Sequence, residues 1–130
     1  MAPEMELFNR LYEVADLLGY QVYDHLPMKN EPVSYPFVVI GDVTTTTIPY
    51  KDDYGGLYAV TVDVWASGED RLIVSQMMEG LSRLGKGFFY TQNYRFQGRA
   101  GQMQKRILTD TSVPDTILMH GVLGLVFKRI

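Results

Sequence analysis

The chain has 130 residues, no cysteine and a formal net charge of −3. This length predicts a single domain over residues 1–130, with a core that needs neither disulfides nor a metal. The lack of cysteine excludes disulfides, zinc–thiolate sites and cysteine nucleophiles, and the mild negative charge argues against a general nucleic-acid-binding protein.

The composition also bears on membranes and partners. The first residues lack the basic region and apolar run of a signal peptide, and no apolar stretch approaches the ~20 residues that a membrane helix needs. We therefore expect no membrane partner. Nine tyrosines and seven methionines are many for this length, and both residue types are enriched at protein interfaces, which indicates a partner surface.

Residues 1–19 have the pattern of an amphipathic helix. Pro3 suits a helix start, Gly19 suits a C-terminal cap, and acidic residues occupy the first turn. The apolar stripe is predicted from spacings of three and four residues, and consists of Phe8, Leu11, Tyr12, Ala15 and Leu18. A brief strand is expected over residues 20–25, followed by a proline-rich loop over residues 26–36.

Two long strands with a polar connection form the centre of the predicted fold. The first covers residues 37–47, with Phe37, Val39 and Val43 expected on one face and Val38, Ile40, Asp42 and Thr44 on the other. Its threonine run, residues 44–47, is predicted to project as an exposed arm. The second covers residues 57–67 and alternates strictly, which assigns Val60, Val62 and Val64 to the core and Trp65 to the opposite face.

The second half of the chain begins with a helix over residues 68–85. Asp70 suits its N-cap, and the stripe is predicted to be Ile73, Met77, Leu81 and Leu84, flanked by Val74 and Met78. One long strand is expected within residues 88–110, bent at Gly98 and Gly101. The last strand is expected over residues 116–130, with one face formed by Ile117, Met119, Leu123, Leu125 and Phe127.

These elements predict an α+β fold. Strand pairs joined by short turns should be antiparallel, and two amphipathic helices need one shared sheet face on which to bury their stripes. We expect a twisted antiparallel sheet of four to five strands with two helices packed on one face.

No residue pattern predicts catalysis, a cofactor or a metal, so the chain is not expected to be an enzyme. His25 and His120 could meet near Asp24 or Asp42 around a metal, but no ligand spacing supports this, and a loop histidine and a strand histidine explain them as well. The acids Asp42, Asp52, Asp53 and Asp63 could act in acid–base chemistry or bind calcium; the alternative is turn and solvent-facing positions.

The remaining patterns also have two interpretations. The glycine pairs 55–56, 85 and 87, and 98 and 101 lack the lysine and Ser/Thr of a phosphate loop, and suit turns and bulges. The most basic section contains Arg95, Arg99, Lys105 and Arg106. With Tyr94 and Phe96 it could form a platform for single-stranded nucleic acid, or a solvated strand face on which Arg95 and Arg99 pair with acids of a neighbouring subunit.

Part of the sequence resembles the tail-completion proteins of long-tailed bacteriophages and prophages. The residues concerned are Tyr23–Pro27, Tyr35–Asp42, Val60–Ala66 and the helix that starts at Asp70. Together they read Tyr-Asp-x-x-Pro, Pro-Phe-Val-Val-Ile-Gly, a hairpin, Val-x-Val-x-Trp and a helix. The resemblance covers roughly residues 20–82, about half of the chain, and contains no catalytic residues.

The resemblance implies a structural role as a tail terminator or head–tail joining protein. Such proteins form a ring, commonly a hexamer, at the head-proximal end of the tail, where they contact the tail tube protein and the head-side connector while DNA passes through without specific binding. The implied location is the virion tail, with assembly in the host bacterial cytoplasm. The alternatives are a head-side connector or stopper protein, and a small-molecule-binding α+β domain with a deep polar pocket.

Overall fold

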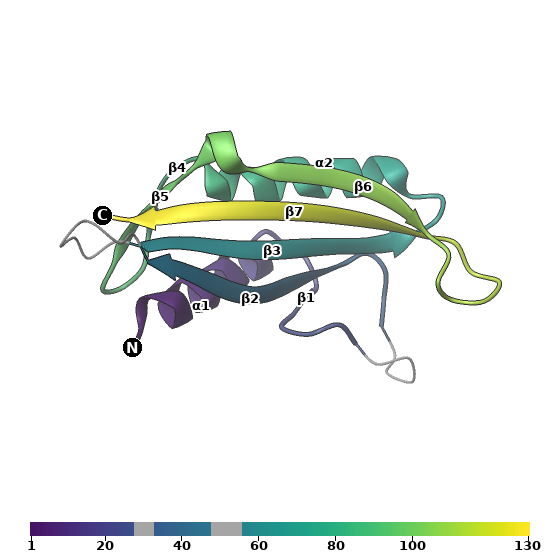
Figure 1. The fold of residues 1–130 in the computed structure, drawn as a ribbon. Coiled ribbons are helices and arrows are strands. Elements are labelled where there is room, and N and C mark those ends of the chain that lie inside the picture. The colour runs from purple at the N-terminus through teal and green to yellow at the C-terminus, as the bar shows by residue number, and fades with distance from the viewer. Residues whose placement is uncertain (28–32, 48–55) are drawn as a thin grey trace.

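The computed structural model describes residues 1–27, 33–47 and 56–130 (Figure 1). In chain order, the elements are α1 (Pro3–Leu17), β1 (Val22–Tyr23), β2 (Phe37–Thr47), β3 (Gly56–Ser67), α2 (Arg71–Ser82), the 3-10 turn η1 (Arg83–Gly85), β4 (Gly87–Tyr90), β5 (Arg95–Gly98), the 3-10 turn η2 (Ala100–Gln102), β6 (Gln104–Asp110) and β7 (Leu118–Arg129). The part of the chain that the structure describes contains no helix long and apolar enough to cross a membrane.

Strands β3 and β7 form the centre of the sheet. They pair antiparallel in continuous register, from Leu57 opposite Lys128 to Ser67 opposite Leu118. β2 lies on the other side of β3, and β1 is added to the outer edge of β2. The outer edge of β7 is shared, since β6 pairs with its first half and β5, followed by β4, pairs with its end (Figure 1).

The α+β class is confirmed, but the prediction of four to five antiparallel strands was too low. The sheet has seven strands and is mixed, because β1 runs parallel to β2. The difference arises mainly in residues 88–110, which form three short strands instead of one long strand. The chain reverses where Thr91 accepts a hydrogen bond from the Tyr94 amide and breaks again at the 3-10 turn η2, so β5 and β6 reach different halves of β7.

A β-bulge in β2 changes which residues face the core. Ile40 pairs with Val62 and Val43 with Val60, so the register shifts between them and places both on the same face. The predicted grouping of Val43 with Phe37 and Val39 was therefore wrong, because strict alternation does not survive an inserted residue. Gly41 fits here because a Cβ would lie 2.9 Å from the carbonyl oxygen of Thr61.

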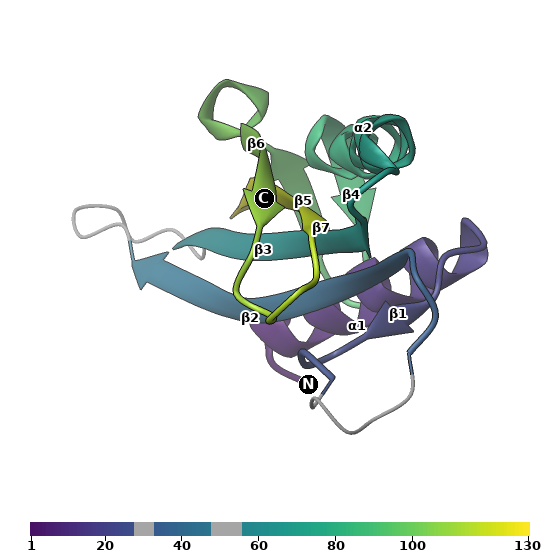
Figure 2. The ribbon, with the colours of Figure 1, turned by 90° about the vertical axis from the view of Figure 1, so that its right-hand side faces the viewer.

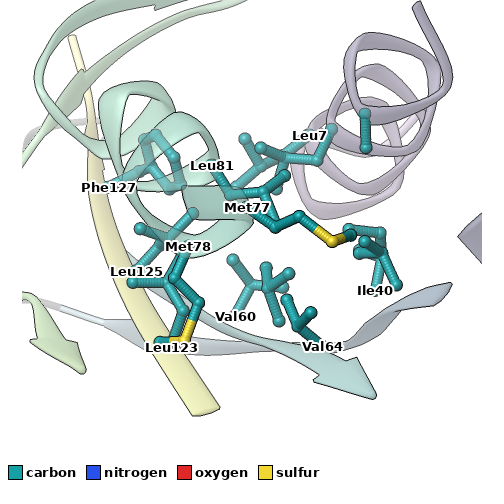
Figure 3. Packing of buried hydrophobic residues seen from close by; sticks show 14 of the residues in the cluster. Leu7, Ile40, Val60, Val64, Met77, Met78, Leu81, Leu123, Leu125 and Phe127 are labelled. Carbon is teal, nitrogen blue, oxygen red and sulfur yellow. The ribbon is translucent and has the colours of Figure 1, made fainter. Parts of the chain in front are cut away.

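Both helices bury their apolar side chains in one cluster on the inward face of the sheet (Figure 3). Val60, Val62 and Val64 are 2%, 1% and 0% exposed, which confirms them as core residues, and each contributes about 1.5–3 kcal/mol. Figure 2 shows α2 beside β4 and β7, and α1 beside β1 and β2. The helix residues at the centre of the cluster are Leu7, Leu11, Ala15, Val74, Met77, Met78 and Leu81.

The ends of the predicted stripes needed correction. Leu18, Ile73 and Ile117 are exposed, because each lies at the margin of its element, where no second layer covers it. Phe8 is only half-buried. Leu7, its neighbour, occupies the position in the core that was predicted for Phe8. Gly19 ends α1 as predicted, with a φ of +92° that a residue with a side chain rarely adopts.

A buried carboxylate joins α1 to the β4–β5 turn. Glu6 is 7% exposed, and it accepts hydrogen bonds from the side chain of Asn93 at 2.7 Å and from its backbone amide at 3.0 Å. The hydrogen bond from the Asn93 side chain lowers the pKa of Glu6, and burial opposes this effect. The contact connects residues 87 positions apart, so it fixes the helix against the edge of the sheet.

A substitution at Gly98 tests how tightly the residues around β5 are packed. A Cβ there would lie 2.1 Å from the carbonyl oxygen of Gly85, whereas a Cβ on Gly124 would find its nearest neighbour at 3.9 Å. We expect Gly98→Ala to lower the free energy of unfolding by about 1–3 kcal/mol, as overpacking does. Gly124→Ala is the matched control and should change it by less than about 0.5 kcal/mol. Equal effects in urea unfolding would contradict the packing described.

Glu6 predicts a pH dependence of stability. Its pKa is lower in the folded chain, so its stabilisation is complete above the unfolded-state pKa and is lost as the pH falls through the folded-state pKa. Glu6→Gln should therefore be less stable than the wild type at pH 7, and the difference should shrink as the pH falls below about 4. Glu13→Gln, which alters an exposed ion pair with Arg10, is the control. A difference that stays constant across denaturation curves from pH 7 to 3 would refute the assignment.

Candidate functional site

Among the described residues, no helix covers the outward face of the sheet, whereas two helices cover the inward face. In β3 the inward row is buried throughout, whereas the outward row of Ala59, Thr61, Asp63 and Trp65 is exposed or half-buried. β7 alternates in the same way, with half-buried residues from His120 to Lys128 on the outward face. The chain thus leaves one side of its longest strands open along about 35 Å, given a rise of roughly 3.3 Å per residue.

A polar and aromatic cluster occupies this open face. His120 and Trp65 are paired across β3 and β7, and their rings stack with centroids 3.8 Å apart and an interplanar angle of 11°. His120 Nε2 donates a hydrogen bond of 2.6 Å to Asp63 Oδ1. The stack and the hydrogen bond hold Trp65 in a fixed orientation, with part of its ring still accessible. The prediction that Trp65 lies on the face opposite the core is confirmed.

Trp65 also forms part of the floor of an apolar groove of about 400 Å³ at one end of the sheet. Phe37 and Leu118 complete the floor, and Tyr35 packs on Phe37 with ring centroids 5.4 Å apart. One wall comes from residues before β2 and the other from the β6–β7 turn. The wall residues are Leu26, Pro27, Val33, Tyr35, Ser112, Val113 and Pro114.

The groove is apolar inside and acidic at its rim. No acid, histidine, lysine or arginine is among the described residues that line it. In the β6–β7 turn beside it, Asp110 accepts hydrogen bonds from the Ser112 hydroxyl and backbone amide, which lower the pKa of Asp110. Asp24 lies two residues before the lining residue Leu26, and the hydrogen bond from His25 lowers the pKa of Asp24. Both carboxylates therefore stay ionised at neutral pH beside an apolar surface.

The structure separates the residues that could have formed a metal site. His25 contacts Asp24, and His120 contacts Asp63. Asp42 is exposed at the bulge of β2, and Asp52 and Asp53 lie outside the described residues. Within residues 1–27, 33–47 and 56–130, no three histidine, cysteine, aspartate or glutamate side chains gather closely enough to hold a metal ion.

The structure argues against one of the two interpretations of the basic section, the platform with Tyr94 and Phe96. Phe96 is fully buried, and Tyr94 is half-buried with the Arg129 guanidinium 5.4 Å from its ring centre. Lys105 pairs with Glu79 of the same chain at 3.5 Å. The exposed aromatics are instead Phe88 and Tyr90 of the edge strand β4, at 59% and 55%.

Sequence reasoning missed these two residues and the groove. Phe88 and Tyr90 flank Phe89, which is buried, so an alternation of period two could have identified them. Val113, an apolar residue in a largely polar turn, could have indicated the groove wall. Its other residues come from segments far apart in the sequence, and no local pattern predicts their meeting.

Comparisons with known proteins show the fold. No protein-family model and no curated protein matches the sequence. A chain of a solved structure described as the virion of a native gene transfer agent particle matches with a TM-score of 0.67 and 15% identity, covering 97% of this chain and 96% of that one. A second solved structure, whose description states no function, matches with a TM-score of 0.57 and 14% identity over 97% of this chain and 92% of the other. The likeness extends over nearly the whole of both chains in each case, so the entire α+β architecture is shared.

The cluster on the open face predicts coupling between Asp63 and His120. Asp63→Ala and His120→Ala should each destabilise the protein, and the double variant should lose less than the sum of the two by about 0.5–3 kcal/mol, because either change alone breaks the same contact. His120→Ala combined with Thr44→Ala, an exposed residue of β2, is the control and should be additive. Additivity of both pairs in urea unfolding would show that the hydrogen bond contributes nothing.

Proposed function

We propose that this chain is a structural protein of a phage-like particle that completes the tail and joins it to the head. The observation that supports this most is the fold match over 97% of the chain with a component of a gene transfer agent virion. The resemblance of residues 20–82 to tail-completion proteins supports the same assignment independently, because it rests on sequence. The two agree on a particle protein, and the resemblance supplies the tail-terminator role.

The surface of the chain suits assembly with other chains. The paired ends of β2 and β3 form an arm whose residues Thr44, Thr45 and Thr46 are exposed, as predicted from the threonine run. The open sheet face offers further contact surface along the same strands, and the apolar groove lies at their opposite end. A subunit of a closed ring needs two different complementary patches of this kind.

In the proposed role, copies of the chain form a ring, a hexamer by family resemblance, at the head-proximal end of the tail tube. The tail tube protein binds one side of the ring and the head-side connector binds the other. DNA passes through the ring without specific binding, in keeping with the net charge of −3. The ring belongs to the virion tail and assembles in the host cytoplasm.

A small-molecule-binding domain is the second candidate, and the groove is the observation that favours it. Its volume of about 400 Å³ lies within the range of roughly 300–1,000 Å³ for ligand pockets. Ligand sites also present converging polar groups, and the only polar side chains among the described lining residues are those of Tyr35, Trp65 and Ser112. The Ser112 hydroxyl is already bonded to Asp110, so the groove suits an apolar side chain of another protein better.

Deletion of the gene from its phage or prophage tests the proposal. Without a terminator, tail tubes should lose their uniform length and fail to join heads, so electron microscopy of lysates should show free heads and tails of variable length. A plasmid copy of the gene should restore normal particles. Tails of normal length attached to heads in the deletion strain would overturn the proposed function.

The same micrographs distinguish the alternatives. Loss of a head-side connector or stopper should leave tails of uniform length beside unattached heads. Loss of a small-molecule-binding domain should leave the particles intact. A position of the gene beside tail-tube and tape-measure genes would support the terminator role independently of the particle morphology.

A further inference from the structure

The two ends of the sheet carry surfaces of opposite character. At one end lies the acidic-rimmed apolar groove described above. At the other end, β4, β5 and the end of β7 present two exposed aromatic rings with basic neighbours (Figure 1). We call this second surface the aromatic edge; it consists of Phe88, Tyr90, Arg95, Gln97 and Lys128.

The register of the strands assembles the aromatic edge on one face. Phe88 pairs with Gln97, which pairs with Lys128, so these three form one row across the sheet. Tyr90 and Arg95 form the next row. The rings of Phe88 and Tyr90 stack along the strand with centroids 6.3 Å apart. Since β4 pairs only with β5 in the described chain, its outer edge remains open to a partner.

The charge of the aromatic edge is not neutralised within the described chain. Arg95 is exposed and Lys128 is half-buried, and neither takes part in an ion pair among the described residues. Two further exposed cations, Lys86 and Arg99, lie directly before β4 and after β5. Two apolar anchors surrounded by cations complement an apolar groove that has the carboxylate of Asp110, bonded to the lining residue Ser112, at its rim, and Asp24 two residues before the lining residue Leu26.

We propose that the aromatic edge of one copy binds in the groove of a second copy, with Phe88 and Tyr90 as the anchors. The contact would be the subunit interface of the proposed ring, and in this respect it rests on the proposed function. The anchors contribute hydrophobic area, and the charges select the orientation in which a basic end meets an acidic end.

The twist of the sheet decides the symmetry of this contact. Three strand steps separate β3 from β4, and adjacent strands rotate by roughly 20–25° each, so the aromatic edge is turned by about 60–75° from the groove. This rotation disfavours a face-to-face dimer in which both pairs of surfaces engage at once. A single head-to-tail contact leaves one groove and one aromatic edge unoccupied, and such contacts form a ring where their rotation closes.

The size of the anchors indicates a weak contact in the isolated protein. Phe88 and Tyr90 are 59% and 55% exposed, so the two rings together can bury about 170–290 Å² on binding, whereas a stable interface buries about 800 Å² on each partner. The contact should therefore exist briefly between free chains and persist where other proteins hold the copies together. A covalent trap detects such a contact better than chromatography does.

The absence of cysteine makes such a trap specific. Gln97→Cys marks the aromatic edge and Val113→Cys marks the groove wall, and both residues are exposed. Mixed under oxidising conditions at low salt, these two variants should form the mixed disulfide about tenfold faster than Gln97→Cys mixed with Leu17→Cys, an exposed control on α1. A mass tag on one chain identifies the mixed product. Equal rates would overturn the proposal.

Removing the anchors is the second arm of the test. Phe88→Ser with Tyr90→Ser, added to the Gln97→Cys chain, should slow the mixed disulfide to the control rate. Leu72→Ser, which replaces an apolar residue on α2 that is even more exposed, at 70%, should leave the rate unchanged. Circular dichroism and urea unfolding confirm that both variants fold. An unchanged rate without the two aromatic rings would overturn their role as anchors.

A chain that carries both cysteines tests the symmetry. Head-to-tail contact should produce a ladder of covalent oligomers or a closed ring, whereas a dimer closed by two disulfides would overturn the head-to-tail geometry.

Complementation of the deletion strain separates this proposal from the proposed function. Suppose that deletion produces abnormal tails and that the chain with Phe88→Ser and Tyr90→Ser restores normal tails fully. The proposed interface is then wrong, and the proposed function stands. If the trap succeeds and deletion is harmless, the contact stands and the function is wrong.

Discussion

The pairing of β3 with β7 is the constraint on which the rest of this structure depends. Eleven consecutive residues of each strand are in register, without a bulge, so both keep strict alternation over their whole length. That alternation produces a fully apolar inward face and a mixed outward face from the same residues. Two helices are enough to cover the inward face, and no third layer covers the outward face among the residues that the structure describes.

The elements with a strong local pattern could be predicted from the sequence. The strand over residues 56–67 was identified because valine recurs at every second position, and α2 because its apolar residues recur at helical spacing. The break-up of residues 88–110 could not be predicted, since it depends on how two short strands share one edge of β7. The bulge at Gly41 was missed because the shift becomes visible only against the partner strand, where Thr61 leaves no room for a side chain.

In the candidate site, too, local patterns could be predicted from the sequence, whereas contacts between distant segments could not. Trp65 could be placed on the outward face from alternation alone, but its stacking on His120 depends on the register of β7. The groove joins residues on both sides of β2 with a turn some eighty positions later, so only the folded chain shows it. The basic section was recognised, but of its two interpretations the platform with Tyr94 and Phe96 does not hold, because Phe96 fills the core, and the exposed Phe88 was not singled out.

The bulge in β2 also has an evolutionary consequence. Beyond it, Thr44, Thr45 and Thr46 are exposed although two strands still pair there, so the hydrophobic cluster does not constrain the identity of these side chains. Substitutions in this stretch have little effect on folding. Selection therefore acts on them mainly through the contacts that the stretch makes with partners. This stretch can therefore diverge quickly between lineages while the scaffold that carries it stays the same.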